Sequence, residues 1–139
     1  MKRSYCFLSL LLLSLLVACS ESQIVQTPRQ VSEAFIQAYY IGDNLQQARA
    51  LTTGQARDRL DKEITLDKAY GEHSSNHPHI HSELISRTKI DNNATEVKYK
   101  VSTKEEGYLI STLGLTRNTE TNTDQWRVST FVENNHFSP

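Results

Sequence analysis

Residues 97–101, Val-Lys-Tyr-Lys-Val, decide the fold of this chain. Apolar and charged side chains alternate here, because Val97, Tyr99 and Val101 are separated by two lysines. Successive side chains of a strand point to opposite faces of its sheet, so this pattern is typical of a strand with one buried face and one face in water. The segment therefore predicts a half-buried strand.

Three other segments have the same period of two. The first is residues 80–90, a long but imperfect strand, and the second is residues 108–116, with Leu109, Leu113 and Leu115 on one face. In the third, the residues alternate between Trp126, Val128, Thr130 and Val132 on one face and Arg127, Ser129 and Phe131 on the other. Turn-forming sequences separate the four segments, at residues 91–93, 105–107 and 118–124. We therefore expect an antiparallel meander of four strands.

The chain before residue 72 has a helical period instead. Pro28 marks the start of a first helix, whose apolar residues recur at helical spacing: Val31, Ala34, Phe35, Ala38 and Tyr39. We expect Gly42 to end this helix and Asp43 to cap the next one, in which Leu45, Ala48 and Leu51 recur.

A third helix is expected after Gly54, with Ala56, Leu60 and Ile64 turned inward. Its charged side chains are expected to point into water and to pair with one another: Arg57, Asp58, Arg59, Asp61, Lys62 and Glu63. Helices followed by antiparallel strands predict the α+β class, with the N-terminal helices packed on the sheet.

The first 19 residues are typical of a secretory signal peptide. Lys2 and Arg3 form a basic head, and the apolar core at residues 7–17 is followed by Ala18 and Cys19. This core has 11 residues, whereas a helix that spans a bilayer needs about 20. The last four residues, Leu-Val-Ala-Cys, resemble the lipobox of bacterial lipoproteins. An ordinary cleavage site and an uncleaved anchor are the alternatives.

The lipobox resemblance implies cleavage before Cys19 and attachment of a diacylglyceryl group to its sulfur, often with a third acyl chain. Two or more chains make a stable attachment to a membrane. Ser20 stands where lipoproteins that stay in the inner membrane of Gram-negative bacteria carry an aspartate. The resemblance therefore favours the outer membrane, with the protein facing the periplasm.

Processing at Cys19 leaves four parts: a removed leader at 1–18, a lipidated tether at 19–28, a domain at 29–134 and a tail at 135–139. Cys6 is lost with the leader and Cys19 carries lipid, so the domain has no disulfide. Thirteen basic residues remain against 16 acidic ones, a net charge near −3. Because no basic stripe is present, the composition argues against a nucleic-acid partner.

A family resemblance rests on Phe35 in the first helix, the Gly42-Asp43 turn, and Trp126-Arg127-Val128 at the start of the last strand. Across residues 28–134 the chain resembles the NTF2-like (cystatin-like cone) superfamily, in particular the small domains of bacterial lipoproteins. This implies a curved sheet around a long helix, forming a cone with a pocket that Tyr39, Tyr40, Tyr99 and Trp126 are candidates to line. It also implies an open sheet face that related proteins often use to form homodimers. The fold implies no single activity.

Four of the five histidines fall within nine residues: His73, His77, His79 and His81. Imidazole is a common ligand for zinc, copper and nickel. Residues two apart in an extended chain point to the same side, so a pair such as His79 and His81 can converge on one ion. The cluster is therefore a candidate metal site, and the alternative is an exposed loop that is rich in histidine.

Residues for acid–base chemistry in a cone pocket are also present: Asp43, Asp67, His81, Glu83 and Tyr99. They do not form a recognisable set of nucleophile, base and orienting group, and the chain has no Walker loop, G-x-S-x-G or C-x-x-C motif. We assign no catalytic residue.

The leading hypothesis is a lipid-anchored, non-enzymatic module of the cell envelope that binds a partner protein or a small ligand. A metal-binding lipoprotein and a small enzyme are the alternatives.

Overall fold

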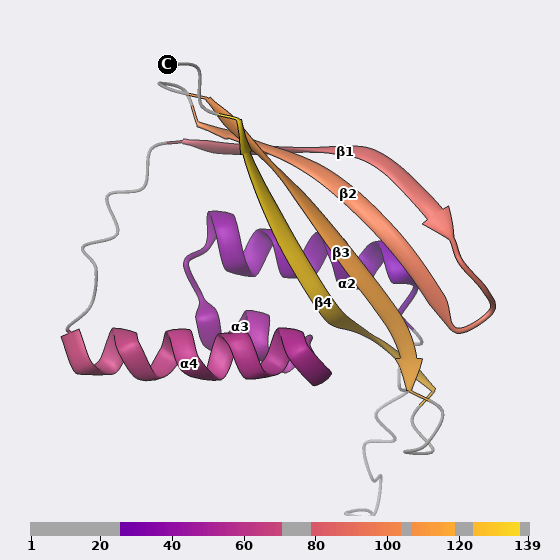
Figure 1. Ribbon diagram of the computed structural model, residues 1–139, viewed down its shortest axis with the longest axis horizontal. Coiled ribbons are helices and arrows are strands. Elements are labelled where there is room, and N and C mark those ends of the chain that lie inside the picture. The colour runs from indigo at the N-terminus through magenta and orange to yellow at the C-terminus, as the bar shows by residue number, and fades with distance from the viewer. Residues whose placement is uncertain (1–25, 71–78, 104–106, 119–123, 137–139) are drawn as a thin grey trace, which may run out of the picture.

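The computed structural model describes residues 26–70, 79–103, 107–118 and 124–136. Four helical segments come first: α2 (Pro28–Ile36), the π-helix η2 (Gln37–Ile41), α3 (Leu45–Ala50) and α4 (Gly54–Tyr70). Four strands follow: β1 (Ile80–Lys89), β2 (Ala94–Thr103), β3 (Tyr108–Asn118) and β4 (Gln125–His136). All described helices precede the strands, which confirms the α+β class (Figure 1). Within these residues no helix is both long and apolar enough to span a bilayer.

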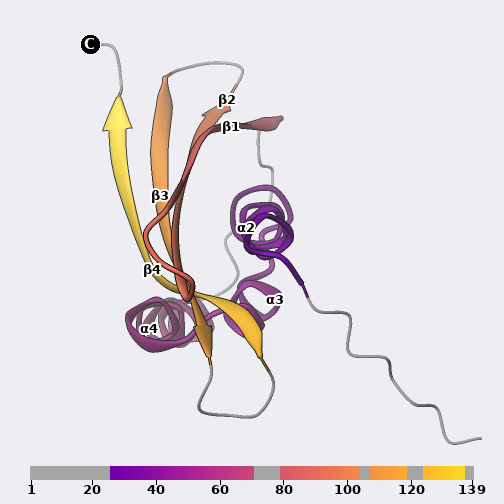
Figure 2. The same cartoon turned by 90° about the vertical axis from the view of Figure 1, so that its right-hand side faces the viewer.

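The strands form one sheet in the order β1-β2-β3-β4, and each strand is antiparallel to the next. The expected meander is confirmed. The helices lie against one face of this bent sheet, and the opposite face is open (Figure 2). β4 continues to His136, so Asn135 and His136 belong to the sheet and not to the expected tail.

The core lies between α2 and the covered face of the sheet. Val97, Tyr99 and Val101 of β2 are all buried, as the alternating pattern predicts. They are joined by apolar residues of every helical segment and of β3 and β4: Val31, Phe35, Ile36, Ala38, Ala48, Ala56, Leu60, Leu113, Leu115, Val128 and Phe131. Each fully buried large side chain stabilises the fold by about 1.5–3 kcal/mol relative to an exposed one.

A β-bulge changes which side chains of β4 reach the core. Ser129 is an extra residue between the sheet pairs made by Val128 and Thr130, and its hydroxyl donates a 3.0 Å hydrogen bond to a backbone oxygen of β3. Val128 and Phe131 are therefore both buried, whereas Val132 is 56% exposed. The expected grouping of Val132 with Val128 is wrong, because one extra residue reverses the alternation beyond it.

A second irregularity interrupts β1. Leu84 and Ser86 pair with consecutive residues of β2, so Ile85 has no partner in the register and is 51% exposed. β1 is an edge strand, and Arg87 and Lys89 near its end are exposed.

The junction between the first two helices differs from the expectation in one residue. Gly42 ends the helix as predicted, and its N–H donates to the carbonyl of Gln37 at 2.7 Å. Asn44, and not Asp43, caps α3, because its side-chain oxygen accepts from the backbone N–H of Gln47 at 2.9 Å. The wider π-turn uses one more residue than an α-turn, and Asp43 takes a positive φ of 46° before the cap.

Candidate functional site

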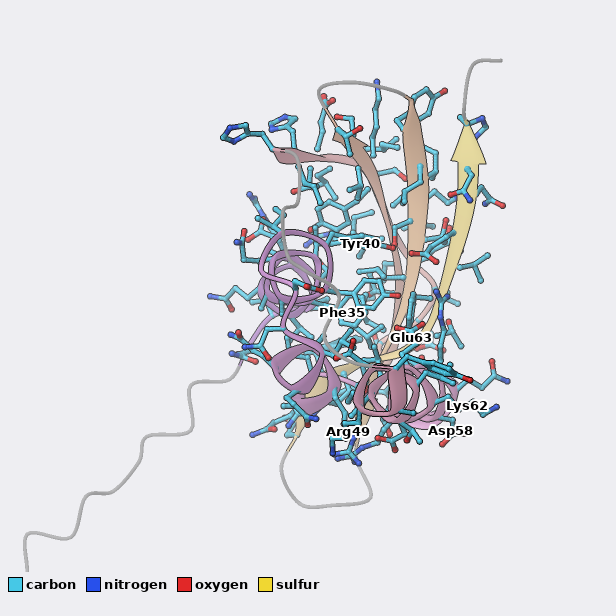
Figure 3. All side chains as sticks on the ribbon, turned by 90° about the vertical axis from the view of Figure 1, so that its left-hand side faces the viewer. Phe35, Tyr40, Arg49, Asp58, Lys62 and Glu63 are labelled. Carbon is cyan, nitrogen blue, oxygen red and sulfur yellow. The ribbon has the colours of Figure 1, made fainter. Side chains whose placement is uncertain are left out.

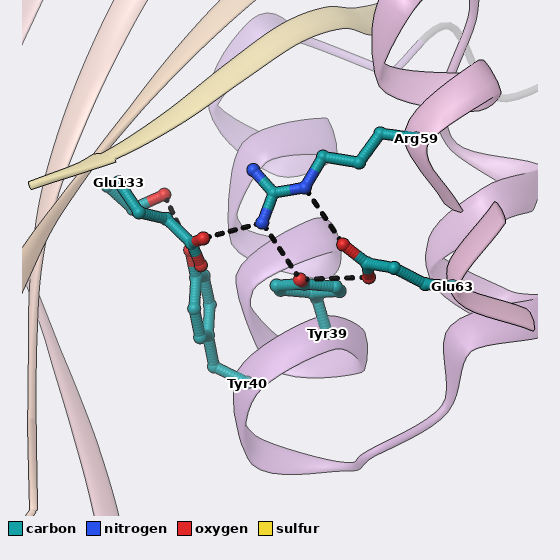
Figure 4. Close-up of polar contacts among 6 residues, drawn as sticks. Tyr39, Tyr40, Arg59, Glu63 and Glu133 are labelled. Atoms are coloured by element: carbon teal, nitrogen blue, oxygen red, sulfur yellow. Dashed lines mark hydrogen bonds and ion pairs between the residues drawn. The ribbon is translucent and has the colours of Figure 1, made fainter. Parts of the chain in front are cut away.

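Six polar side chains from four elements meet on the covered face of the sheet (Figure 4). We call this group the Arg59 cluster, and its members are Tyr39, Tyr40, Arg59, Glu63, Ser111 and Glu133. Figure 3 shows Tyr40 and Glu63 pointing into the space between the helices and the sheet, close to Phe35. The cluster therefore lies between the helices and the covered face of the sheet.

Local structure explains why these residues meet. Arg59 and Glu63 are one helical turn apart on α4, a spacing that lets their side chains pair. Tyr39 and Tyr40 are consecutive residues of η2, and their rings touch edge to face at 4.8 Å between centroids. The bulge in β4 turns Glu133 to the covered face, where it pairs in register with Ser111.

Arg59 joins the two glutamates. Its Nη2 atom donates to Oε2 of Glu133 at 2.6 Å, and its Nε atom donates to Oε1 of Glu63 at 2.8 Å. The hydroxyl of Tyr40 donates to the other oxygen of Glu133 at 2.7 Å, and that of Tyr39 donates to the other oxygen of Glu63 at 3.0 Å. All four carboxylate oxygens therefore accept a hydrogen bond from within the protein.

Aromatic rings form the base of the cluster. The guanidinium carbon of Arg59 lies 4.0 Å from the centre of the Phe131 ring, a cation–π contact. Phe131 also packs against Phe35 and Tyr39, with 5.2 Å between the ring centroids in both pairs. The charged head of Arg59 is thus held between carboxylates and an apolar floor.

The cluster is only partly shielded from water, since the side chains of Arg59, Glu63 and Glu133 are 37%, 29% and 23% exposed. Burial raises the pKa of Tyr39 and of Tyr40 well above the ordinary value, and the nearby charge of Glu133 adds to this effect. Burial alone would lower the pKa of Arg59, but its hydrogen bonds to the two glutamates outweigh this and raise it. The phenols therefore stay neutral and the guanidinium stays charged.

The open face of the sheet carries a shallow polar groove near the end of β4. Its lining residues are Lys98, Ile110, Thr112, Glu133, Asn134, Asn135 and His136, of which Glu133 directs its carboxylate to the Arg59 cluster. Beside it the ring of Tyr108 is stacked on His136 at 5.0 Å, and Nζ of Lys100 lies 4.6 Å from the centre of the same ring. This groove offers both hydrogen-bond donors and hydrogen-bond acceptors to a ligand.

The proposed pocket residues lie in different places. Tyr39 belongs to the Arg59 cluster, whereas Tyr99 is buried in the core and shares a 3.0 Å hydrogen bond with Ser32. Trp126 packs against the core from the start of β4, at the opposite end of that strand from Glu133. The structure therefore does not gather these residues around one pocket.

The acid–base candidates are also dispersed. His81 and Glu83 are exposed on β1, where Glu83 pairs with Lys100 on the open face of the sheet. Asp67 lies on α4, Asp43 precedes α3, and Tyr99 is in the core. Among the described residues these groups form no common site.

Cys19, His73 and His77 lie outside the described residues. His79 and His81 are described and exposed. Within residues 26–70, 79–103, 107–118 and 124–136 no group of three or more His, Cys, Asp or Glu side chains is placed to hold a metal ion.

Sequence reasoning missed the role of Arg59, which it placed among outward charges, and it missed Ser111 and Glu133. The i,i+4 spacing of Arg59 and Glu63 was a usable signal, but the partner on β4 depends on the bulge, which the alternation did not reveal.

Comparison with known proteins adds no family, since no family model and no curated protein matches this sequence.

Replacement of Arg59 by methionine is expected to lower the free energy of unfolding by about 1–3 kcal/mol, because two part-buried carboxylates lose their shared donor. Arg57→Met is the matched control, since Arg57 is exposed on the same helix and its loss should change stability by no more than about 0.5 kcal/mol. Urea unfolding followed by circular dichroism measures both. Equal losses in the two variants would show that the cluster does not hold α4 in place.

The raised tyrosine pKa values predict loss of stability in alkali. An unfolded chain releases a phenol proton near pH 10, but the folded chain retains those of Tyr39 and Tyr40, so the free energy of unfolding should fall above about pH 10 by up to about 1.4 kcal/mol per pH unit for each tyrosine. The Tyr39→Phe/Tyr40→Phe variant should have a shallower slope. Tyr70→Phe is the control, because Tyr70 is 82% exposed and meets water in both states. An unchanged slope in the double variant would contradict the assignment.

Proposed function

We propose that this chain is a lipid-anchored protein of the cell envelope, held by acylated Cys19 in the outer membrane and facing the periplasm. Its single domain binds a partner protein or a small ligand and catalyses no reaction. The observation that supports a binding role without catalysis is the Arg59 cluster. Its acids and phenols, the groups that acid–base chemistry would need, are bonded to one another and hold α4 and η2 on the sheet.

We also propose that the domain is an NTF2-like cone. Support comes from the order of elements, with helices first and an antiparallel meander after them. Further support comes from the bent sheet, which holds α2 against its covered face. The Gly42 turn and the position of Trp126 at the start of β4 fit the same resemblance.

The groove on the open face is the surface that best suits a ligand. Lys98 and His136 carry donors, Asn134 carries both a donor and an acceptor, and all three line the groove. The covered face is instead filled by core side chains such as Phe35 and Leu113, which are fully buried. Binding through the open face therefore requires no rearrangement of the core.

The anchor has a direct test. Cys19→Ser is expected to abolish acylation and to move the protein from the membrane fraction to the soluble fraction of the cell envelope, because the acyl chains provide the attachment. Mass spectrometry of the mature protein measures the added lipid. Cys6→Ser is the control and should leave both results unchanged. Membrane attachment that survives Cys19→Ser would contradict the proposal.

A metal-binding role for the histidine cluster is the alternative, with zinc, copper or nickel as the ion. It is supported by the exposure of His79 and His81, which are two residues apart at the start of β1. On this alternative the His79→Ala/His81→Ala variant should lose binding of one equivalent of Zn²⁺ in calorimetric titration. His136→Ala is the control, since His136 lies on another strand. Zinc binding that is equal in the double variant and the unaltered protein would exclude this site.

A further inference from the structure

The start of α2 lies at the same end of the molecule as four other chain segments. The antiparallel register brings together the end of β1, the start of β2, the end of β3 and the start of β4. In Figure 1 the first turn of α2 and the β1–β2 turn both lie at the right, and Figure 2 looks directly onto this side. We call it the tether end and define it by residues 87–96, 116–117 and 124–127.

The proposed anchor places this end near the lipid. The chain runs through eight Cα–Cα steps from residue 19 to residue 27, which span at most about 29 Å when fully extended. The tether end is therefore the part of the domain that the anchor holds closest to the membrane surface.

The tether end carries exposed basic residues on β1, at the edge of the sheet. Its basic residues are Arg87, Lys89, Arg117 and Arg127, and its acidic residues are Asp91, Glu96 and Asp124. Arg117 pairs with Asp124, and Glu96 pairs with Lys98. Glu120, in the sequence between β3 and β4, brings the acidic residues to four, so the basic residues are distinguished by their exposure on β1 and not by a net charge. In the first turn of α2, Arg29 is balanced by Glu33 at 2.7 Å. The mature chain as a whole carries 13 basic and 16 acidic residues.

Two apolar side chains accompany these charges. Ile90, directly after β1, is 65% exposed. Trp126 is half-buried at the start of β4, next to Arg127. Tryptophan with neighbouring basic residues is typical of protein surfaces that meet lipid headgroups, because the ring favours the interface and the cations favour anionic lipids.

We propose that the tether end rests on an anionic lipid surface, with Arg87, Lys89 and Arg127 against the headgroups. This inference rests on the proposed acylation of Cys19 and adds an orientation to it. The groove near the end of β4 then lies at the end of the sheet that points away from the membrane, where a partner can reach it. Attraction of basic residues to an anionic surface is worth about 1 kcal/mol for each residue near it, so the lipid anchor supplies the attachment and the charges supply the orientation.

Trp126 is the only tryptophan of the chain and reports this orientation directly. The acylated protein is reconstituted in vesicles that carry a nitroxide-labelled headgroup lipid, made either of phosphatidylcholine alone or with added phosphatidylglycerol. Quenching of Trp126 fluorescence is expected to be about twofold stronger in the anionic vesicles, and about 0.5 M salt should remove the difference. Quenching that is equal in both kinds of vesicle at low salt would overturn the proposal.

Charge reversal gives an independent test. Arg87→Glu/Lys89→Glu alters two exposed residues of the tether end and should abolish the extra quenching, while the protein still floats with the vesicles. Lys62→Glu/Lys68→Glu makes the same change in two exposed residues of α4, far along that helix from the tether end, and should retain it. Circular dichroism checks that both variants are folded. Equal quenching in both variants overturns the orientation, whereas protein that does not float at all refutes the anchor instead.

Discussion

The bulge at Ser129 is the constraint on which the rest of the structure depends. One extra residue in β4 turns Phe131 and Glu133 to the same face as Val128. Phe131 then supports the guanidinium of Arg59, and Glu133 accepts hydrogen bonds from Arg59 and Tyr40. Without the bulge these two side chains would face water, and α4 would have no polar contact of this kind with the sheet.

The need for this contact follows from the composition of α4. The helix has 17 residues, yet only Ala56, Leu60 and Ile64 are buried. So narrow an apolar stripe fixes the position of a helix weakly, whereas hydrogen-bonded charges require a particular geometry. The bond between Arg59 and Glu133 therefore specifies where α4 lies more than it adds to stability, since pairs that are partly exposed contribute modestly.

The positions of the helices and strands can be predicted from the periodicity of the sequence. Burial of one face of a helix or strand imposes a repeat of apolar residues that is visible within that segment alone. The bulge cannot be predicted from this periodicity. Each of the two alternating sets of residues around Ser129 contains an apolar side chain, Val132 in one set and Phe131 in the other. Only pairing with β3 decides between them. The cap of α3 is similar, because Asp43 and Asn44 are equally suited to capping and the π-turn selects Asn44. Long-range contacts thus determine what local pattern leaves open.

The irregular β1 has a consequence for a protein crowded on a surface. If the protein is anchored in a membrane as proposed, neighbouring copies are confined to two dimensions, where their sheet edges meet often. A straight, apolar edge would then recruit a strand from a neighbour. The unpaired Ile85 bends the edge of β1, and Arg87 and Lys89 place like charges along it. Neighbouring molecules therefore repel one another at this edge, and the protein can reach high density without forming continuous intermolecular sheets.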